Sequence, residues 1–328
     1  MFQSLKIDTE FADESDTEIF DKLMQWAAPA GLQDLRVRGS SGFMKYPHYS
    51  QTAFESISAC AASLEILQLE GFKYSAAVFG RESWSKFRVL RELVLNGVSF
   101  DFFDQEEIDP FAGFPALEQL SLISCCRCID RDVDDPLTDV AILVVNGQQL
   151  LTLEINKPIG FSEIRVSAAR LTSFTFKFAI LRSYPITRVS LNAPSLEHAA
   201  VNLKGYKDST VDLSEEEVQN ADDLNEEAVQ TRYAALIYGL RRAESLVFKF
   251  GTTTAFWSAC QLLRGRPSPF GRLTYLALRH KEEDMAVITD DHEVVISYFF
   301  GIFGRRVDCG HRVTEITRLY PRTIIPSN

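Results

Sequence analysis

The sequence predicts an α/β fold in which stacked strand-and-helix units form a curved solenoid with one parallel sheet. Two observations support this prediction: an apolar L-x-x-L-x-L pattern recurs along most of the chain, and helix signals separate several of its copies. At 46% apolar content a single copy arises easily by chance, so the prediction depends on the regular order of the copies. One unit cannot bury its apolar side alone, whereas stacked units share a continuous core.

Ten copies of the pattern are expected to form the strands of the parallel sheet. They begin at Phe2, Leu32, Leu64, Leu90, Leu117, Leu150, Leu171, Leu196, Ala243 and Leu273. Two of the intervals carry a second apolar stretch, at residues 164–166 and 189–191. Each stretch is expected to form a further short strand before the next copy begins.

Four intervals carry apolar residues at helical spacing, which predicts helices with one buried face each. The first follows a capping Ser15-Asp16, the second follows Ser50, the third lies in residues 254–264 and the fourth in residues 226–239. The expected buried faces are Ile19, Leu23 and Trp26; Phe54, Ile57 and Ala61; Phe256, Cys260 and Leu263; and Val229, Tyr233, Leu236 and Leu240.

The repeats are expected to form a single solenoid over residues 1–300, followed by a divergent tail over residues 301–328. The longest interval contains an acidic insertion, residues 205–227, which is predicted to be an exposed loop that leads into a solvated helix. A dedicated acidic docking segment is the alternative for this insertion.

Three segments carry a resemblance to a known family: residues 90–100 (LRELVLNGVSF), 114–125 (FPALEQLSLISC) and 192–197 (NAPSLE). They resemble stretches of the plant F-box/leucine-rich-repeat proteins, including those that end in an FBD domain. The similarity extends over residues 2–300. It implies a leucine-rich-repeat solenoid, with helices and irregular segments on its convex side, whose repeats select a target protein.

In that family an N-terminal F-box binds a Skp1-type adaptor within a cullin ubiquitin ligase. Here the first repeat strand begins at Phe2, so we expect no F-box and therefore no assembly with the adaptor. Residues 302–328 also depart from the family and suggest an altered or truncated gene product. Two functions follow as alternatives: the substrate-recognition part of a ubiquitin-ligase adaptor, or an F-box-less competitor or scaffold without a role in ubiquitination.

Composition limits the partners that we expect. A net charge of −11 argues against binding to nucleic acid or anionic membranes, which requires clustered Lys and Arg. The sequence contains neither an apolar run long enough to span a bilayer nor a signal peptide, so we expect a cytoplasmic or nuclear protein. Six cysteines without regular spacing are expected to be reduced.

No enzymatic constellation is recognisable, so we expect neither catalysis nor a cofactor. A nucleophile elbow, an H-E-x-x-H motif and a phosphate loop are all missing from the sequence. Cys125, Cys126 and Cys128 suggest a metal site, but they lack a paired C-x-x-C and a nearby His, so structural cysteines are the preferred interpretation. A hydrolase or transferase on an α/β sheet is a remote alternative.

The third, fifth and seventh positions of each repeat should point away from the core and form the concave, strand-lined face. This face is predicted to bind an unknown protein target. The expected partner-binding residues are Asp34, Arg36, Arg38, Gln68, Glu70, Glu92, Asn96, Gln119, Ser121, Thr152, Glu154, Thr175, Lys177, His198, Lys249, Tyr275 and Arg279. Part of this ladder is expected to be plain solvated surface, and Asn at the seventh position is expected to serve backbone hydrogen bonding at the end of the strand.

Overall fold

The computed structural model describes residues 3–9, 14–39, 47–71, 73–75, 85–101, 107–127, 141–179, 188–204, 234–250 and 270–280. The chain divides into two compact units. Unit 1 comprises Met1–Thr172 and Val189–Pro194, and unit 2 comprises Ser173–Arg188 and Ser195–Asn328.

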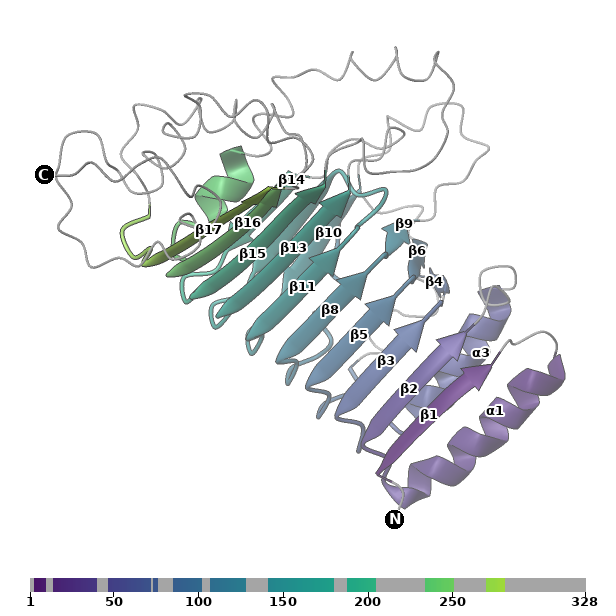
Figure 1. The fold of residues 1–328 in the computed structure, drawn as a ribbon. Helices are drawn as coiled ribbons and strands as arrows, with labels where there is room; N and C mark the ends of the chain where they lie inside the picture. The colour runs from purple at the N-terminus through teal and green to yellow at the C-terminus, as the bar shows by residue number, and fades with distance from the viewer. Residues whose placement is uncertain are drawn as a thin grey trace, which may run out of the picture. The chain divides into compact units, whose positions relative to one another are not determined.

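Unit 1 is built on six parallel strands (Figure 1). In spatial order they are β1 (Ser4–Thr9), β2 (Asp34–Gly39), β3 (Ile66–Glu70), β5 (Glu92–Asn96), β8 (Gln119–Ile123) and β11 (Thr152–Asn156). The order in space is therefore the order in the chain, as the repeat pattern predicted.

The alternation of burial along these strands confirms the L-x-x-L-x-L pattern. In β2, Leu35 and Val37 are 0% and 1% exposed, whereas Arg36 and Arg38 between and after them are exposed. The fourth and sixth positions of the next four strands are buried in the same way. The leading leucines, Leu32, Leu64, Leu90, Leu117 and Leu150, are also buried, so they close the core beside the start of each strand.

Unit 1 contains two further parallel sheets. One consists of β4 (Lys73–Ser75), β6 (Ser99–Asp101) and β9 (Cys126–Arg127), and the other of β14 (Arg188–Asn192), β12 (Glu163–Ser167), β10 (Ile142–Asn146) and β7 (Glu107–Ile108). Strands β12 and β14 confirm the two additional strands predicted from the sequence. The other five were not predicted. Strands β4, β6, β7 and β9 have only two or three residues each. Strand β10 carries an apolar run, residues 142–145, whose signal was missed because it does not follow the repeat pattern.

The first predicted helix exists, but its predicted buried face was wrong. Helix α1 (Glu14–Ala27) buries Phe20, Met24 and Ala27, whereas Ile19 is 63% and Trp26 is 55% exposed. Two apolar stripes run side by side along this helix: the stripe of Phe20 and Met24 is buried, whereas in the predicted stripe only Leu23 is half-buried. The covering element is α3 (Pro47–Ser58) with the turn after it, whose Ser56 Oγ donates to Asp21 Oδ1 at 2.7 Å.

The second helix was predicted correctly. Phe54, Ile57 and Ala61 are each at most 2% exposed, and they lie in α3 and the turn that follows it. A short 3-10 helix, η1 (Ala28–Ala30), joins α1 to the β2 repeat and ends at Gly31, which has φ of 72°.

Unit 2 contains four parallel strands, β13 (Ser173–Ala179), β15 (His198–Lys204), β16 (Ser245–Phe250) and β17 (Tyr275–His280). Helical residues 234–239 precede β16, and Leu236 and Leu240 are buried there as predicted. The predicted helix of residues 254–264, the side chains of Val229 and Tyr233, the acidic insertion and the tail lie outside the described residues. No helix in the described parts of the chain is long and apolar enough to cross a membrane.

Candidate functional site

The outward positions of the unit 1 strands form one regular array, which we call the ladder face. It consists of Ser4, Lys6, Asp8, Asp34, Arg36, Arg38, Ile66, Gln68, Glu70, Glu92, Val94, Asn96, Gln119, Ser121, Ile123, Thr152, Glu154 and Asn156. Every strand pair keeps the same register, so the third, fifth and seventh positions form three rows that cross all six strands. Eleven of the predicted partner-binding residues therefore lie on one continuous surface.

The charged end of the ladder face is internally paired. Arg36 Nε and Nη2 donate to Asp34 Oδ1 and Oδ2 at 3.2 and 3.3 Å. The hydrogen bond to Asp34 is the main reason that the pKa of Arg36 is raised above its ordinary value. Arg38 Nε lies 3.1 Å from Glu70 Oε1 on the neighbouring strand, and Lys6 Nζ lies 3.3 Å from Asp8 Oδ2. The basic side chains of β1 and β2 thus present ion pairs rather than a field of positive charge.

The middle of the ladder face is neutral at its fifth and seventh positions, whereas the third position of β5 is Glu92. At the fifth and seventh positions, β5 and β8 carry Val94, Asn96, Ser121 and Ile123, all of them half-buried. The half-buried apolar groups lie among amide and hydroxyl groups, as they do at the centre of many protein interfaces. A partner could therefore bury uncharged surface here without leaving a charge unpaired.

Unit 2 has a corresponding array of its own. Its register aligns Ser173, His198, Ser245 and Tyr275 in one row, and Lys177, Asn202, Lys249 and Arg279 in another. The predicted Thr175 lies between these rows beside Ala200. The register alone places Lys177, Lys249 and Arg279 at equivalent strand positions.

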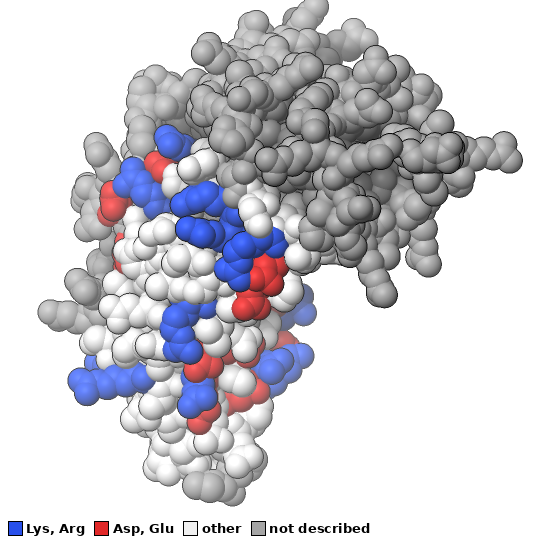
Figure 2. Space-filling view, turned by 90° about the vertical axis from the view of Figure 1, so that its left-hand side faces the viewer, with Lys and Arg blue, Asp and Glu red and all other residues white. Residues whose placement is uncertain are grey.

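Charges of both signs also occur outside these rows. Figure 2 shows basic and acidic side chains next to one another among uncharged residues on the side of the molecule that it presents. One such pair, Arg272 with Glu244, joins the turns before β17 and β16 in unit 2. Surface pairs of this kind contribute little stability, and they leave a mixed polar surface.

At the strand ends, Asn96 and Asn156 form hydrogen bonds through their backbone and not through their side chains. The carbonyl oxygen of Asn96 accepts from the N–H of Gly71 at 2.8 Å, and that of Asn156 accepts from the N–H of Ser124 at 2.7 Å. Ile123 accepts the equivalent bond from Gly97 at 2.8 Å. Because an isoleucine serves equally well, this bond does not require asparagine.

The cysteine cluster is split between core and surface. Cys125 is 2% exposed, and its thiol donates to the carbonyl oxygen of Leu95 at 3.3 Å. Burial raises the pKa of the Cys125 thiol to about 12, so it stays protonated at neutral pH. Cys126 is half-buried beside Ser99, and Cys128 lies outside the described residues. Within the described ranges, no three His, Cys, Asp or Glu side chains are grouped in a way that could hold a metal ion.

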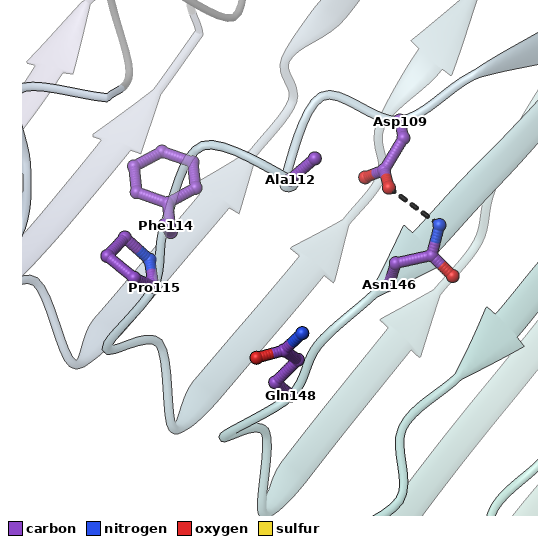
Figure 3. A pocket seen from close by; sticks show the side chains of 6 residues that line it. All are labelled: Asp109, Ala112, Phe114, Pro115, Asn146 and Gln148. Carbon is purple, nitrogen blue, oxygen red and sulfur yellow. Dashed lines mark hydrogen bonds between the residues drawn. The ribbon is translucent and has the colours of Figure 1, made fainter.

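A pocket of about 510 Å³ in unit 1 was not predicted from the sequence (Figure 3). It is lined by Asp109, Ala112, Phe114, Pro115, Asn146 and Gln148. Asp109 Oδ2 accepts from Asn146 Nδ2 at 2.8 Å, and Oδ1 accepts from the N–H of Phe111 at 3.1 Å. Burial nevertheless raises the pKa of Asp109 above its ordinary value.

The pocket has a structural interpretation. Asp109 joins the turn after β7 to the end of β10, and no motif marks the contact because the two residues are 37 positions apart. Asp109 is the one ionisable group among the six lining residues that the structure describes. The lining therefore supplies one carboxyl group beside the side-chain amides of Asn146 and Gln148.

Comparison with known proteins adds no family assignment. No protein-family model matches the chain, and no curated protein sequence is significantly similar to it.

Proposed function

We propose that the chain is a protein-recognition module of the leucine-rich-repeat solenoid type, and that the ladder face of unit 1 binds a protein target. The observation that carries the proposal is the shared register of its six strands, which aligns the outward side chains in unbroken rows. At about 4.8 Å between neighbouring strands, the face is about 24 Å wide, which suits a helix or a folded loop of a partner.

The chemistry of the face supports binding. The backbone groups of the inner strands β2, β3, β5 and β8 are used in the sheet, so side chains meet a partner there, and strands hold them more rigidly than loops do. Its neutral centre contains Val94, Ser121 and Ile123, and paired charges such as Arg38 with Glu70 lie toward β1. A desolvated centre with a polar surround is the arrangement in which a few contacts supply most of the binding energy.

The proposed cellular role follows the resemblance in sequence. The repeats would select a protein as the substrate-recognition part of an F-box ubiquitin-ligase adaptor does, or they would hold the same protein as a competitor or scaffold. Co-purification with a Skp1-type adaptor distinguishes the two roles. Stable binding of the adaptor supports the ligase role, and a captured target without the adaptor supports the competitor or scaffold.

A pair of identical substitutions tests the binding face. Ser121→Arg adds a long cation to the centre of the ladder face, whereas Ser167→Arg adds the same group to an exposed position of β12 in the other sheet. Proteins captured from cell extract by the unaltered chain are quantified against both variants by mass spectrometry. A target that binds the ladder face is lost with Ser121→Arg and kept with Ser167→Arg.

Folding is checked first, because an arginine at a half-buried site can disturb the sheet. Circular dichroism and the thermal midpoint of both variants should match those of the unaltered chain. If every captured protein binds Ser121→Arg as well as Ser167→Arg, the ladder face is not the binding site.

A further inference from the structure

Strand β1 ends the sheet of unit 1 with an open backbone edge. Among the strands that the structure describes, β1 pairs with β2 alone. The carbonyl oxygen of Gln3 accepts from the N–H of Asp34 at 2.9 Å, so alternate residues from Gln3 onward direct their backbone groups toward β2. The groups of Ser4, Lys6 and Asp8 therefore point to the outer edge, where they are available to another strand.

The core is also incomplete at this end of unit 1. Leu5 and Ile7 are half-buried, although the equivalent residues of β2, Leu35 and Val37, are 0% and 1% exposed. Helix α1 lies at the same end of the unit as β1 (Figure 1) and exposes Ile19 to 63%. An open edge beside exposed apolar side chains is a surface that soluble proteins usually cover.

We propose that two copies of this chain associate through this end, with β1 of one copy pairing antiparallel with β1 of the other. A two-fold axis between the strands makes the same residues serve both copies. Ile19, exposed on α1 at the same end of the unit, is available for apolar contact between the copies. The ladder faces of both copies lie on the same side of the extended sheet and stay open.

The charges on β1 select one register for this pairing. In an antiparallel pair, two residues bond when both direct their backbone N–H and C=O toward the partner strand. In β1 these residues are Ser4, Lys6 and Asp8, so the opposed pairs come from these three. If the two-fold axis passes beside Lys6, Lys6 faces Lys6 of the second copy, and if it passes beside Asp8, Asp8 faces Asp8. Both registers therefore place like charges opposite each other. Placing Lys6 opposite Asp8 of the second copy makes two attractive pairs by symmetry, and it brings Ile7 opposite Ile7 on the core side.

This self-complementarity is the reason for choosing a second copy as the occupant. The edge carries one cation and one anion at consecutive outward positions, and the same two groups supply both halves of each pair. Within one copy, Lys6 and Asp8 already lie 3.3 Å apart, and both side chains are more than half exposed. The pair is therefore accessible for exchange between copies.

A mixing experiment tests the pairing. The full chain carries its purification tag at the C-terminus, and its association is measured by sedimentation velocity over a wide range of concentration. Lys6→Asp gives two acidic outward positions and Asp8→Lys gives two basic ones, so each variant alone opposes like charges. We expect each to dimerise about tenfold or more weakly than the unaltered chain.

An equimolar mixture of the two variants should recover the dimer, because acidic positions of one then face basic positions of the other. This recovery cannot come from the pair within one copy, which stays broken in both variants. Ile19→Ser should also weaken dimerisation, whereas Glu18→Ser on the neighbouring exposed position should not. An unaltered chain that stays monomeric, or a mixture that stays monomeric while the unaltered chain dimerises, overturns the proposal.

Discussion

The backbone N–H of Gly97 donates to the carbonyl oxygen of Ile123 at 2.8 Å and so links the end of β5 to the end of β8. The link is repeated along unit 1, because Gly71 and Ser124 donate to Asn96 and Asn156 in the same way. The donors follow their strands directly and have φ of 61°, 76° and 50° for Gly97, Gly71 and Ser124. Lys157, which follows β11, has φ of 52°. Each of these four strands is therefore followed by a left-handed residue.

Gly97→Ala and Ser124→Gly should change stability in opposite directions. A Cβ at Gly97 would lie 3.8 Å from the nitrogen of Gly71, an ordinary contact, so the left-handed backbone is the main cost. We expect Gly97→Ala to lower the free energy of unfolding by about 1 kcal/mol and Ser124→Gly to raise it by up to about 1 kcal/mol. Urea unfolding followed by circular dichroism measures both.

Gly271→Ala is the control for this pair, because a Cβ there meets nothing within 4 Å and its φ is not positive. It should change the free energy of unfolding by about 0.5 kcal/mol or less. If Ser124→Gly destabilised the chain as much as Gly97→Ala does, conformational strain would not explain the glycines at these turns.

The burial of Cys125 should lower the free energy of unfolding at alkaline pH. Its folded pKa of about 12 exceeds the ordinary value of 9.0, so its contribution to stability is complete below pH 9.0 and is lost as the pH rises toward 12. Across that window the unaltered chain should lose about 1.4 kcal/mol per pH unit relative to Cys125→Ala, which cannot ionise. Urea unfolding of both chains at several pH values measures the difference, and parallel curves would contradict the expected burial.

The sequence predicted the main sheets well because one physical requirement, an apolar residue at every inward position, fixes strand, register and order together. It did not predict which side of α1 is buried. Ile19, Leu23 and Trp26 have the same helical spacing as Phe20, Met24 and Ala27, and only the packing of α3 decides between them. The Asp109–Asn146 contact was not predictable either, since it joins distant turns without a periodic signal. The ladder face required the register alone, so its positions could be predicted, whereas its partner could not.

Ionisation of Asp109 should lower the free energy of unfolding as the pH rises above the acidic range. Burial raises its folded pKa above the ordinary 3.8, so its stabilising contribution is present below pH 3.8 and is lost as the pH rises through the folded pKa. Asp109→Asn keeps the shape of the side chain and does not ionise. The free energy of unfolding of the unaltered chain should therefore fall relative to that of Asp109→Asn over this window, and a relative rise would contradict the direction of the pKa shift.

The two apolar stripes of α1 should differ sharply in their contribution to stability. Met24 is 0% exposed on the side of α1 that α3 covers, so Met24→Ala leaves a cavity there. We expect a loss of about 2–5 kcal/mol in the free energy of unfolding for Met24→Ala. Ile19→Ala removes a side chain that is 63% exposed and should cost about 0.5 kcal/mol or less in the monomer. Urea unfolding of both variants at a concentration where the chain is monomeric measures the contrast. Equal losses would mean that the Ile19 stripe is covered within a single copy, which would also remove the apolar part of the proposed contact between copies.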